Sequence, residues 1–387
     1  DIESYPFIEA VRQFRWDVGE KNSLVIHLTL LPFLSAAGEL KTKPTQHSVK
    51  KLMESGVNAD IIVCRTERSI GQDLRSKIAL FCNVDINSVI ESIDAKTIYE
   101  VPLLMQQEKL DQVVLNKLNL PNTKSDLKDW KNFVKKLKNP KQNIKIGLIG
   151  KYVELQDSYK SILESFVHAG AINEVKIDVV PIHSESIEST NVAVELSKLD
   201  GILVAPGFGE RGIEGKISSI KYARENNLPF LGICLGMQMA VIEFARNVLS
   251  LSSANSTEMD DSTKHPVISL MDDQVEVQDK GGTMRLGSWK CKIVKESLAY
   301  KIYNEETISE RHRHRYELNF DYMDKLADSG MVFSGLNPKT GLVEIIEIPN
   351  HDWFLGVQFH PEYQSTVENP HPVFVSFVKA CKNKSKK

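Results

Sequence analysis

Residues 229–238 read PFLGICLGMQ, and this stretch decides the fold that we expect for the second half of the chain. An apolar run enters a Gly-x-Cys-x-Gly sequence, and a helical pattern that places Val241, Phe244 and Val248 on one face follows at once. A strand that turns sharply into a helix around a reactive side chain is the nucleophile-elbow arrangement, here with cysteine in place of serine. The sulfur of Cys234 would lie at a helix N-terminus, where the macrodipole and the free amides favour the thiolate.

Cys234 also has a plainer interpretation. A lone cysteine at the end of a strand is more often a buried structural residue than a nucleophile. Gly232, Gly236 and the strand-to-helix junction favour the nucleophile, because they leave room for a sharp turn with close backbone neighbours. In that arrangement the amide of Leu235 is placed to stabilise an oxyanion.

Apolar runs typical of strands alternate with helical patterns on both sides of this turn. The expected strands cover residues 144–150, 175–182, 201–205, 229–234, 343–348 and 354–359. One helix would begin at a cap formed by Asp157 or Ser158, and another would include residues 217–227. Strands separated by helices indicate an α/β fold with a mostly parallel, buried sheet.

A second candidate group follows the last of these strands. His360 ends the apolar run, and Glu362 comes two residues later in the sequence HPE. In open α/β sheets catalytic groups collect at the C-terminal ends of strands, so His360 and Cys234 should share an edge. Glu362 could then orient the imidazole as the third member of a triad. Taken alone, His-Pro-Glu is more often an ordinary strand exit, and it is the elbow that favours catalysis.

The length of the chain and a break in its pattern indicate two domains. At 387 residues the chain exceeds one ordinary core. Residues 121–142 enclose a lysine-rich helix between Pro-Asn and Asn-Pro. Its apolar face consists of Leu127, Trp130, Phe133, Val134 and Leu137. We expect domains at 1–120 and 143–383, with this linker helix docked on one of them. The first domain opens inside what reads as an element, so we also expect a truncated N-terminus.

The composition argues against several classes of function. A net charge of −3, with Lys and Arg interspersed among Asp and Glu, argues against a broad nucleic-acid surface. No apolar run approaches the ~20 residues of a membrane span, and no basic and apolar leader opens the chain. Five scattered cysteines without CxxC pairs predict reduced thiols and a cytoplasmic protein, and neither a disulfide framework nor a zinc site.

Together, the elbow and the His-Pro-Glu sequence resemble the class I glutamine amidotransferases. The resemblance implies a flavodoxin-like parallel sheet and hydrolysis of glutamine through a γ-glutamyl thioester, with the ammonia passed to a partner domain. It makes Cys234 the nucleophile, His360 the base and Glu362 the orienting group. The glutamine site that it implies includes Gly207, Leu235, Gly236, Met237 and Gln238.

The same family has a glycine-rich loop after an earlier strand, and the loop backbone supplies a second oxyanion amide. Here residues 205–209 read APGFG, and we expect Gly207 to provide that amide. Pro206 stands where the family usually has the first glycine, which removes one backbone donor. If that first amide were the one required, the oxyanion hole would be weaker.

Three further stretches are similar to CTP synthases and occur in the same order: residues 254–258 (ANSTE), 281–287 (GGTMRLG) and 311–317 (RHRHRYE). By that similarity Glu258 and Arg315 would bind the α-amino and α-carboxylate groups of glutamine, and arginine suits a carboxylate. Without the resemblance, residues 311–315 would be interpreted as a solvated strand of alternating charge and Glu258 as a loop carboxylate.

The first 120 residues extend the similarity and imply part of a P-loop-type amidoligase α/β domain. Residues 41–46 read KTKPTQ and resemble the loop that grips the phosphates of UTP, or of CTP as feedback inhibitor. The UTP/CTP residues that the resemblance implies are Asp1, Ile2, Glu3, Lys41, Thr42, Lys43, Pro44, Thr45, Gln46 and Lys77. Asp94 and Ala95 fall where the family touches the adenine of ATP. As a bare motif, Lys-Thr-Lys is usually part of an ordinary surface.

The resemblance as a whole implies an ATP-dependent ligase of pyrimidine biosynthesis that aminates UTP to CTP with ammonia from glutamine. ATP, Mg²⁺, activation by GTP, feedback inhibition by CTP and a homotetramer come with it. No phosphate-loop sequence occurs in this chain. We therefore expect that loop and the magnesium ligands ahead of Asp1, and glutaminase activity alone for this chain. Two alternatives stay open, a glutaminase that serves another synthetase and a catalytically idle regulatory subunit.

Overall fold

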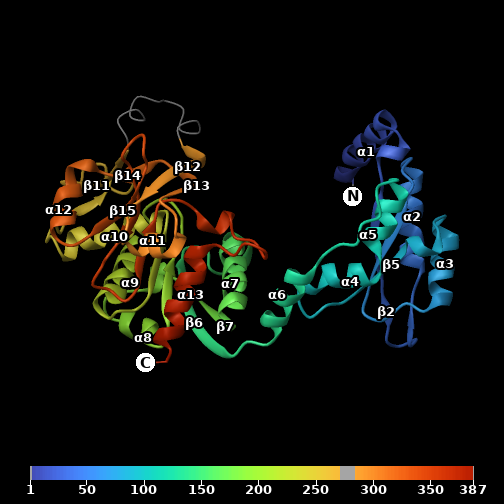
Figure 1. Cartoon of the computed structure of the whole chain (residues 1–387), viewed down its shortest axis with the longest axis horizontal. Coiled ribbons are helices and arrows are strands. Elements are labelled where there is room, and N and C mark those ends of the chain that lie inside the picture. Colours follow the sequence, from blue (N-terminus) through green and yellow to red (C-terminus); the bar gives the residue numbers. More distant parts are fainter. Residues whose placement is uncertain (1, 271–283, 387) are drawn as a thin grey trace. The chain divides into compact units, whose positions relative to one another are not determined.

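The computed structural model describes residues 2–270 and 284–386. The chain divides into two compact units, Asp1–Val134 and Lys135–Lys387 (Figure 1). Each unit has its own sheet and its own buried core. Within the described ranges, no helix has the length and the apolar character needed to cross a membrane.

The first unit is built on a short parallel sheet. Among its described residues, three strands pair in the order β1-β4-β5, with Ile26 opposite Ile61 and Val63 opposite Ile90. Its strands are β1 (Ile26–Leu31), β2 (Phe33–Leu34), β3 (Glu39–Leu40), β4 (Ile61–Thr66) and β5 (Val89–Ile93). Its helices are α1 (Tyr5–Val18), α2 (Lys43–Glu54), α3 (Gln72–Cys82), α4 (Val101–Gln107) and α5 (Leu110–Lys117).

Alternate residues of β4 pack on opposite faces of this sheet. Ile62 lies in a core with α2 and α3, while Ile61 lies in a smaller cluster with residues of α4 and α5. The neighbouring strand β1 buries Thr29 and Leu31 but leaves Leu28 65% exposed. The sheet is therefore covered fully on one face and only in part on the other.

The helix predicted between the domains is α6 (Lys128–Lys138). Trp130 donates its Nε1 hydrogen to the carbonyl oxygen of Tyr99 at 2.7 Å, and the ring of Phe133 meets the ring of Tyr99 edge-on at 5.1 Å. The first turns of α6 thus pack on the first unit. The division between the units falls inside the helix, after Val134.

The second unit is built on a large mixed sheet. Its described residues include nine strands in the order β13-β12-β15-β16-β17-β9-β8-β6-β7. These strands are β6 (Gln142–Gly150), β7 (Val175–His183), β8 (Gly201–Val204), β9 (Phe230–Ile233), β12 (Arg285–Ile293), β13 (Thr307–His314), β15 (Val332–Leu336), β16 (Val343–Glu347) and β17 (Phe354–Val357). A smaller sheet joins β10 (Ala254–Ser256), β11 (His265–Leu270) and β14 (Tyr316–Leu318).

The strand directions correct the expectation of a mostly parallel sheet. From β17 through β9, β8 and β6 to β7 every pair is parallel, whereas from β13 to β17 every pair is antiparallel. Residues 337–342 and 348–353, which join β15, β16 and β17, are too short for a helical crossover, so these strands must run antiparallel. The parallel half is the one that carries the expected elbow.

Helices cover both faces of this sheet (Figure 1). The helices of the unit are α7 (Lys160–Asn173), α8 (Val192–Leu196), α9 (Ile213–Glu225), α10 (Leu235–Asn247), α11 (Leu298–Tyr303), α12 (Met323–Asp328) and α13 (Pro372–Lys384). Phe230 packs with α9 and α10 and stacks on Phe354 at 4.3 Å, while its neighbour Leu231 lies in the core formed with α7 and α13.

The expected cap of α7 was wrong. Asp157 and Ser158 lie in a 3₁₀ turn, Gln156–Tyr159, and α7 begins at Lys160 without a side-chain cap. The tighter turn brings the buried Tyr159 against the sheet, where its hydroxyl accepts a hydrogen bond from the amide of Lys151 at 3.3 Å. The start of α7 is therefore marked by the packing of the Tyr159 ring and not by a polar cap.

Candidate active site

Cys234 stands between β9 and α10 with φ +54° and ψ −105°. Residues other than glycine rarely adopt a positive φ, and this ψ lies outside the usual left-handed region, so the backbone is strained. Its amide donates to the carbonyl oxygen of Val357 at 2.7 Å and so ties the turn to β17. A Cβ added to Gly236 would lie 2.2 Å from the carbonyl oxygen of Val204, so only glycine permits this turn to pack on β8. These features form a nucleophile elbow.

His360 and Glu362 reach the same edge because β17 pairs with β9, with Val357 opposite Ile233. His360 Nδ1 donates to Glu362 Oε1 at 2.7 Å, which directs Nε2 away from the carboxylate. The His360 amide donates to the carbonyl oxygen of Arg311 at 2.8 Å, and the ring of Tyr363 stacks on the imidazole with centroids 5.0 Å apart. Two contacts thus fix the imidazole, and the third fixes the backbone of His360.

The charge on His360 depends on its neighbours. Burial disfavours the charged imidazole, but the charge of Cys234, hydrogen bonding to Cys234 and the Glu362 carboxylate together raise the pKa of His360 to about 11. Nε2 has no partner of strict hydrogen-bond geometry among the described residues. Catalytic hydrogen bonds are often long before substrate binds, and the charges of Cys234 and His360 act on each other without one. The arrangement favours a protonated imidazole beside the sulfur of Cys234.

The expected oxyanion groups lie at and beside the turn that carries Cys234. Leu235, Gly236, Met237 and Gln238 form the buried first turn of α10. Gly207 follows β8, and a Cβ built on it would lie 3.5 Å from a side-chain methyl of Leu235. Gln238 donates to the carbonyl oxygen of Tyr316 at 2.9 Å, which connects this turn to β14.

Glu258 and Arg315 come to the same end of the unit. Glu258 Oε1 accepts a hydrogen bond from the amide of Gly209 at 2.7 Å, so it contacts the loop that carries Gly207. Burial raises the pKa of Tyr316, Glu258 raises it further and Arg315 lowers it, which places both charges near this tyrosine. Of the GGTMRLG motif, residues 281–283 lie outside the described residues.

Comparisons with known proteins agree with this geometry. Residues 1–120 match the family described as CTP synthase N-terminus, and residues 154–380 match glutamine amidotransferase class-I. The chain is 64% identical over its whole length to CTP synthase of Flavobacterium johnsoniae, of which it covers 72%, and 54% identical to that of Clostridium acetobutylicum, of which it also covers 72%. The chain belongs to the CTP synthase family. Proteins of this family are ligases, and the second unit is their class I glutamine amidotransferase domain.

A solved structure supports the same assignment of the second unit. It is the glutaminase domain of Trypanosoma brucei CTPS with bound acivicin, at 38% identity and a TM-score of 0.59. The match covers 62% of this chain and 94% of that one. The mixed sheet, with its parallel half behind the elbow, is therefore the fold of a CTP synthase glutaminase domain.

The residues that the CTP synthase resemblance assigned to UTP or CTP mostly lie on the surface of the first unit. Asp1 is outside the described residues, and Ile2 and Glu3 are exposed in a 3₁₀ turn. The stretch KTKPTQ precedes and opens α2. Lys41 pairs with Glu39, and the pKa of Glu39 is lowered first by Lys41 and also by Lys77, so these two lysines share a region.

Within KTKPTQ the side chains differ in what they can reach. Lys43 and Pro44 are exposed, whereas Thr45 is fully buried and donates to the carbonyl oxygen of Leu30 at 3.1 Å. Thr42 accepts from Gln46 at 3.1 Å. Asp94 and Ala95, assigned to ATP, follow β5, and Arg65 pairs with Asp94 at 3.5 Å. Lys43 and, in part, Lys41 are the charged groups of this stretch that face solvent.

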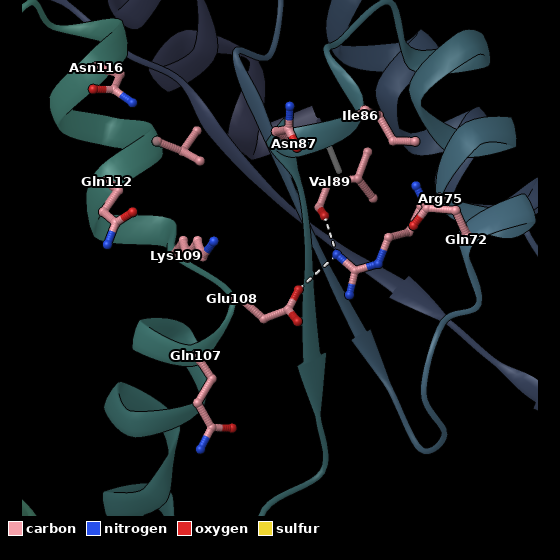
Figure 2. Close-up of a pocket in the computed structure, with 11 residues that line it drawn as sticks. Gln72, Arg75, Ile86, Asn87, Val89, Gln107, Glu108, Lys109, Gln112 and Asn116 are labelled. Carbon is pink, nitrogen blue, oxygen red and sulfur yellow. Dashed lines mark hydrogen bonds and ion pairs between the residues drawn. The ribbon is translucent and has the colours of Figure 1, made fainter.

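The first unit also has a cavity of about 400 Å³ between α3, β5 and α5 (Figure 2). Its main charged groups pair with each other. Arg75 donates to the carbonyl oxygen of Val89 at 2.7 Å and pairs with Glu108 at 2.8 Å. None of the residues assigned to a nucleotide lines this cavity, so we place no part of the site there.

Reasoning from sequence missed two groups of buried charges in the second unit. Lys151 and Lys216 are 7% and 0% exposed and contact the loop at residues 205–209. Arg285 binds Glu317 at 2.9 Å and also pairs with Glu344. The sequence did indicate that Lys216 is buried, because Ile213 lies three residues before it and Ile220 four residues after it, on the apolar face of α9.

The buried face of β13 also differs from a solvated strand of alternating charge. Arg311 and Arg313 are exposed, but His312 and His314 are buried and share a hydrogen bond of 2.9 Å between their rings. Burial, followed by the charge of Arg285, lowers the pKa of His312 to about 2 and that of His314 to about 3. These histidines are neutral packing groups, which distinguishes them from His360.

Proposed function

We propose that the second unit hydrolyses glutamine through a thioester on Cys234, and that the ammonia serves the family reaction, ATP-dependent amination of UTP to CTP. The observation that carries this proposal is the strained Cys234 elbow beside the buried His360–Glu362 pair. Thiolate, base and orienting carboxylate are the parts that an acyl transfer by cysteine needs.

The residues would act in two steps. In the first, the Cys234 thiolate attacks the γ-carbonyl carbon, and the amides of Leu235 and Gly207 stabilise the oxyanion. His360 gives its proton to the amide nitrogen, the C–N bond breaks and ammonia leaves. In the second, His360 takes a proton from water as the water attacks the thioester. Glutamate leaves and the thiolate and imidazolium are restored. Glu362 holds the imidazole in one orientation throughout.

Glu258 and Arg315 are proposed to hold the amino-acid end of glutamine. Glu258 has a second carboxylate oxygen beyond the one bonded to Gly209, and this oxygen can accept from an α-ammonium group. Arg315 can bind the α-carboxylate with two parallel hydrogen bonds. One charge of each sign at the same end of the unit suits a free amino acid.

The nucleotide side of the proposal rests on the first unit. Lys41, Lys43 and Lys77 would meet the phosphates of UTP or CTP, and Asp94 with Ala95 would meet ATP. No cluster of three or more metal-ligating side chains is found in the described ranges, so we assign no Mg²⁺ ligand and derive no step through the metal. Activation by GTP, a homotetramer and a cytoplasmic location belong to the same proposal. The absence of any disulfide among the five cysteines supports the last of these.

The test is release of ammonia from glutamine by the purified 387-residue chain, with and without GTP. We expect turnover by the wild type and none by Cys234→Ala. Cys291→Ala serves as a matched control, because Cys291 is also buried but lies in β12, away from the elbow. Equal activity of the wild type and Cys234→Ala would refute the proposal.

A further inference from the structure

Two buried lysines hold the loop at residues 205–209 by its carbonyl oxygens. Lys216, on α9, donates to the carbonyl oxygen of Ala205 at 3.2 Å. Lys151, just after β6, donates to the carbonyl oxygens of Phe208 and of Gly209, the latter at 2.9 Å. The loop is therefore anchored at both ends by lysine amino groups that come from different elements.

These anchors leave two backbone amides in the middle of the loop available to donate hydrogen bonds. A trans peptide points its carbonyl oxygen and its N–H in opposite directions. The peptide between Phe208 and Gly209 is held on both sides, by Lys151 at its oxygen and by Glu258 at its hydrogen. Within the described residues, the amides of Gly207 and Phe208 have no acceptor. The two fixed peptides thus flank the two amides that can face an oxyanion.

The burial of Lys216 calls for a reason beyond packing. Its side chain is 0% exposed and makes one hydrogen bond to the part of the chain that the structure describes, and a Cβ built on Gly207 would lie 3.8 Å from its Nζ. Burying an ammonium group with so few partners is costly. Burial first, and then the charge of Lys151, lower the pKa of Lys216 to about 7, although the charges of Cys234 and Glu258 act in the opposite direction.

We propose that Lys216 and Lys151 are positioning residues of the glutaminase reaction, which fix the loop so that the Gly207 amide faces the oxyanion formed at Cys234. The inference rests on the proposed function. Pro206 makes such anchors useful, because it has no N–H with which the loop could bind its surroundings at that point. Neither lysine contacts the substrate in this account.

The variants that test this role are Lys216→Met and Lys151→Met, each of which keeps an unbranched apolar stem and removes the donor. Ser219→Ala is the matched control, since Ser219 is fully buried on α9 and, among residues 2–270 and 284–386, bonds only to the carbonyl oxygen of Gly215 in its own helix. We expect each lysine variant to lower kcat for glutamine about tenfold or more with KM changed less than about threefold. Ser219→Ala should keep both values.

Hydrogen exchange measures the loop without reference to activity. Backbone amide hydrogens in peptides that cover residues 205–209 should exchange faster in each lysine variant than in the wild type and in Ser219→Ala. Alkylation of Cys234 by iodoacetamide, which needs no oxyanion amide, should keep its rate within about threefold. Unchanged exchange in both lysine variants would overturn the positioning role, even if activity fell. If the wild type released no ammonia, the proposed function would fail while the exchange experiment still decided the role of the lysines.

Discussion

The two units differ in how they hold the charges that matter for function. In the second unit Cys234, His360 and Glu362 are about one-twentieth exposed or less and act on one another. In the first unit the assigned lysines face solvent, and the side chain of Lys41 is 40% exposed. A buried charge is costly unless its neighbours compensate, so the structure itself marks a reactive centre. An exposed lysine costs little, and only the family resemblance singles it out.

The largest expected effect is the difference in glutamine hydrolysis between a variant in the second unit and a variant in the first. Cys234→Ala should lower glutamine hydrolysis by at least about a thousandfold, because the nucleophile is lost. Lys43→Ala, in the other unit, should leave this rate unchanged within error. The measurement is ammonia release at saturating glutamine. A strong loss in Lys43→Ala would mean that the two units do not divide the work as described.

The next effect concerns the carboxylate behind the imidazole. Glu362→Gln should lower kcat about a hundredfold, because the glutamine side chain no longer stabilises the imidazolium that protonates the leaving nitrogen. The raised pKa of His360 depends partly on Glu362, so the alkaline limb of the pH–rate profile should move to lower pH. The same raised pKa adds stability that is complete below about pH 6.5 and is lost as the pH rises toward 11. An unmoved alkaline limb would contradict this role.

A smaller effect separates the two tasks assigned to Glu258. Glu258→Gln keeps an acceptor for the Gly209 amide but loses the charge that meets an α-ammonium group, so KM should rise about tenfold with kcat nearly kept. Glu258→Ala loses both contacts and should lower kcat as well. Steady-state kinetics with glutamine measure this split. Identical behaviour of the two variants would show that the bond to Gly209 has no part in catalysis.

The smallest effect is expected in the first unit. Lys43→Ala should weaken binding of UTP or CTP up to about fivefold, since an exposed lysine contributes little to one ion pair. The loss should shrink as ionic strength rises. Titration calorimetry at two salt concentrations tests this, with Lys50→Ala, an exposed lysine later in α2, as the control. An equal loss of affinity in Lys50→Ala would mean that the total charge of α2, and not the position of Lys43, affects nucleotide binding.

The elbow was predictable because its determinants are local. Gly232, Cys234 and Gly236 lie within five residues of one another, and the apolar run before them and the helical pattern after them place the turn. The position of His360 needed one tertiary step, the pairing of β17 with β9, which follows from the tendency of catalytic groups to collect at strand ends. Fold class and triad candidates therefore came from short motifs.

Contacts between distant loops could not be obtained in this way. The bond from Gly209 to Glu258 joins residues 49 positions apart, and no pattern in either stretch indicates the other. The anchor at Lys216 depends on where α9 places its fourth residue relative to the end of β8. The antiparallel half of the sheet could be predicted in part from the sequence, since residues 348–353 leave no room for a crossover helix.

The central claim is that the sulfur of Cys234 is the group that meets the side-chain amide of glutamine. The most direct measurement is covalent labelling of the 387-residue chain with the diazoketone analogue of glutamine, followed by peptide mapping. We expect one adduct, on Cys234, which free glutamine suppresses and Glu258→Gln slows. Adducts spread over the other four cysteines, or an unlabelled Cys234 that still reacts with iodoacetamide, would contradict it.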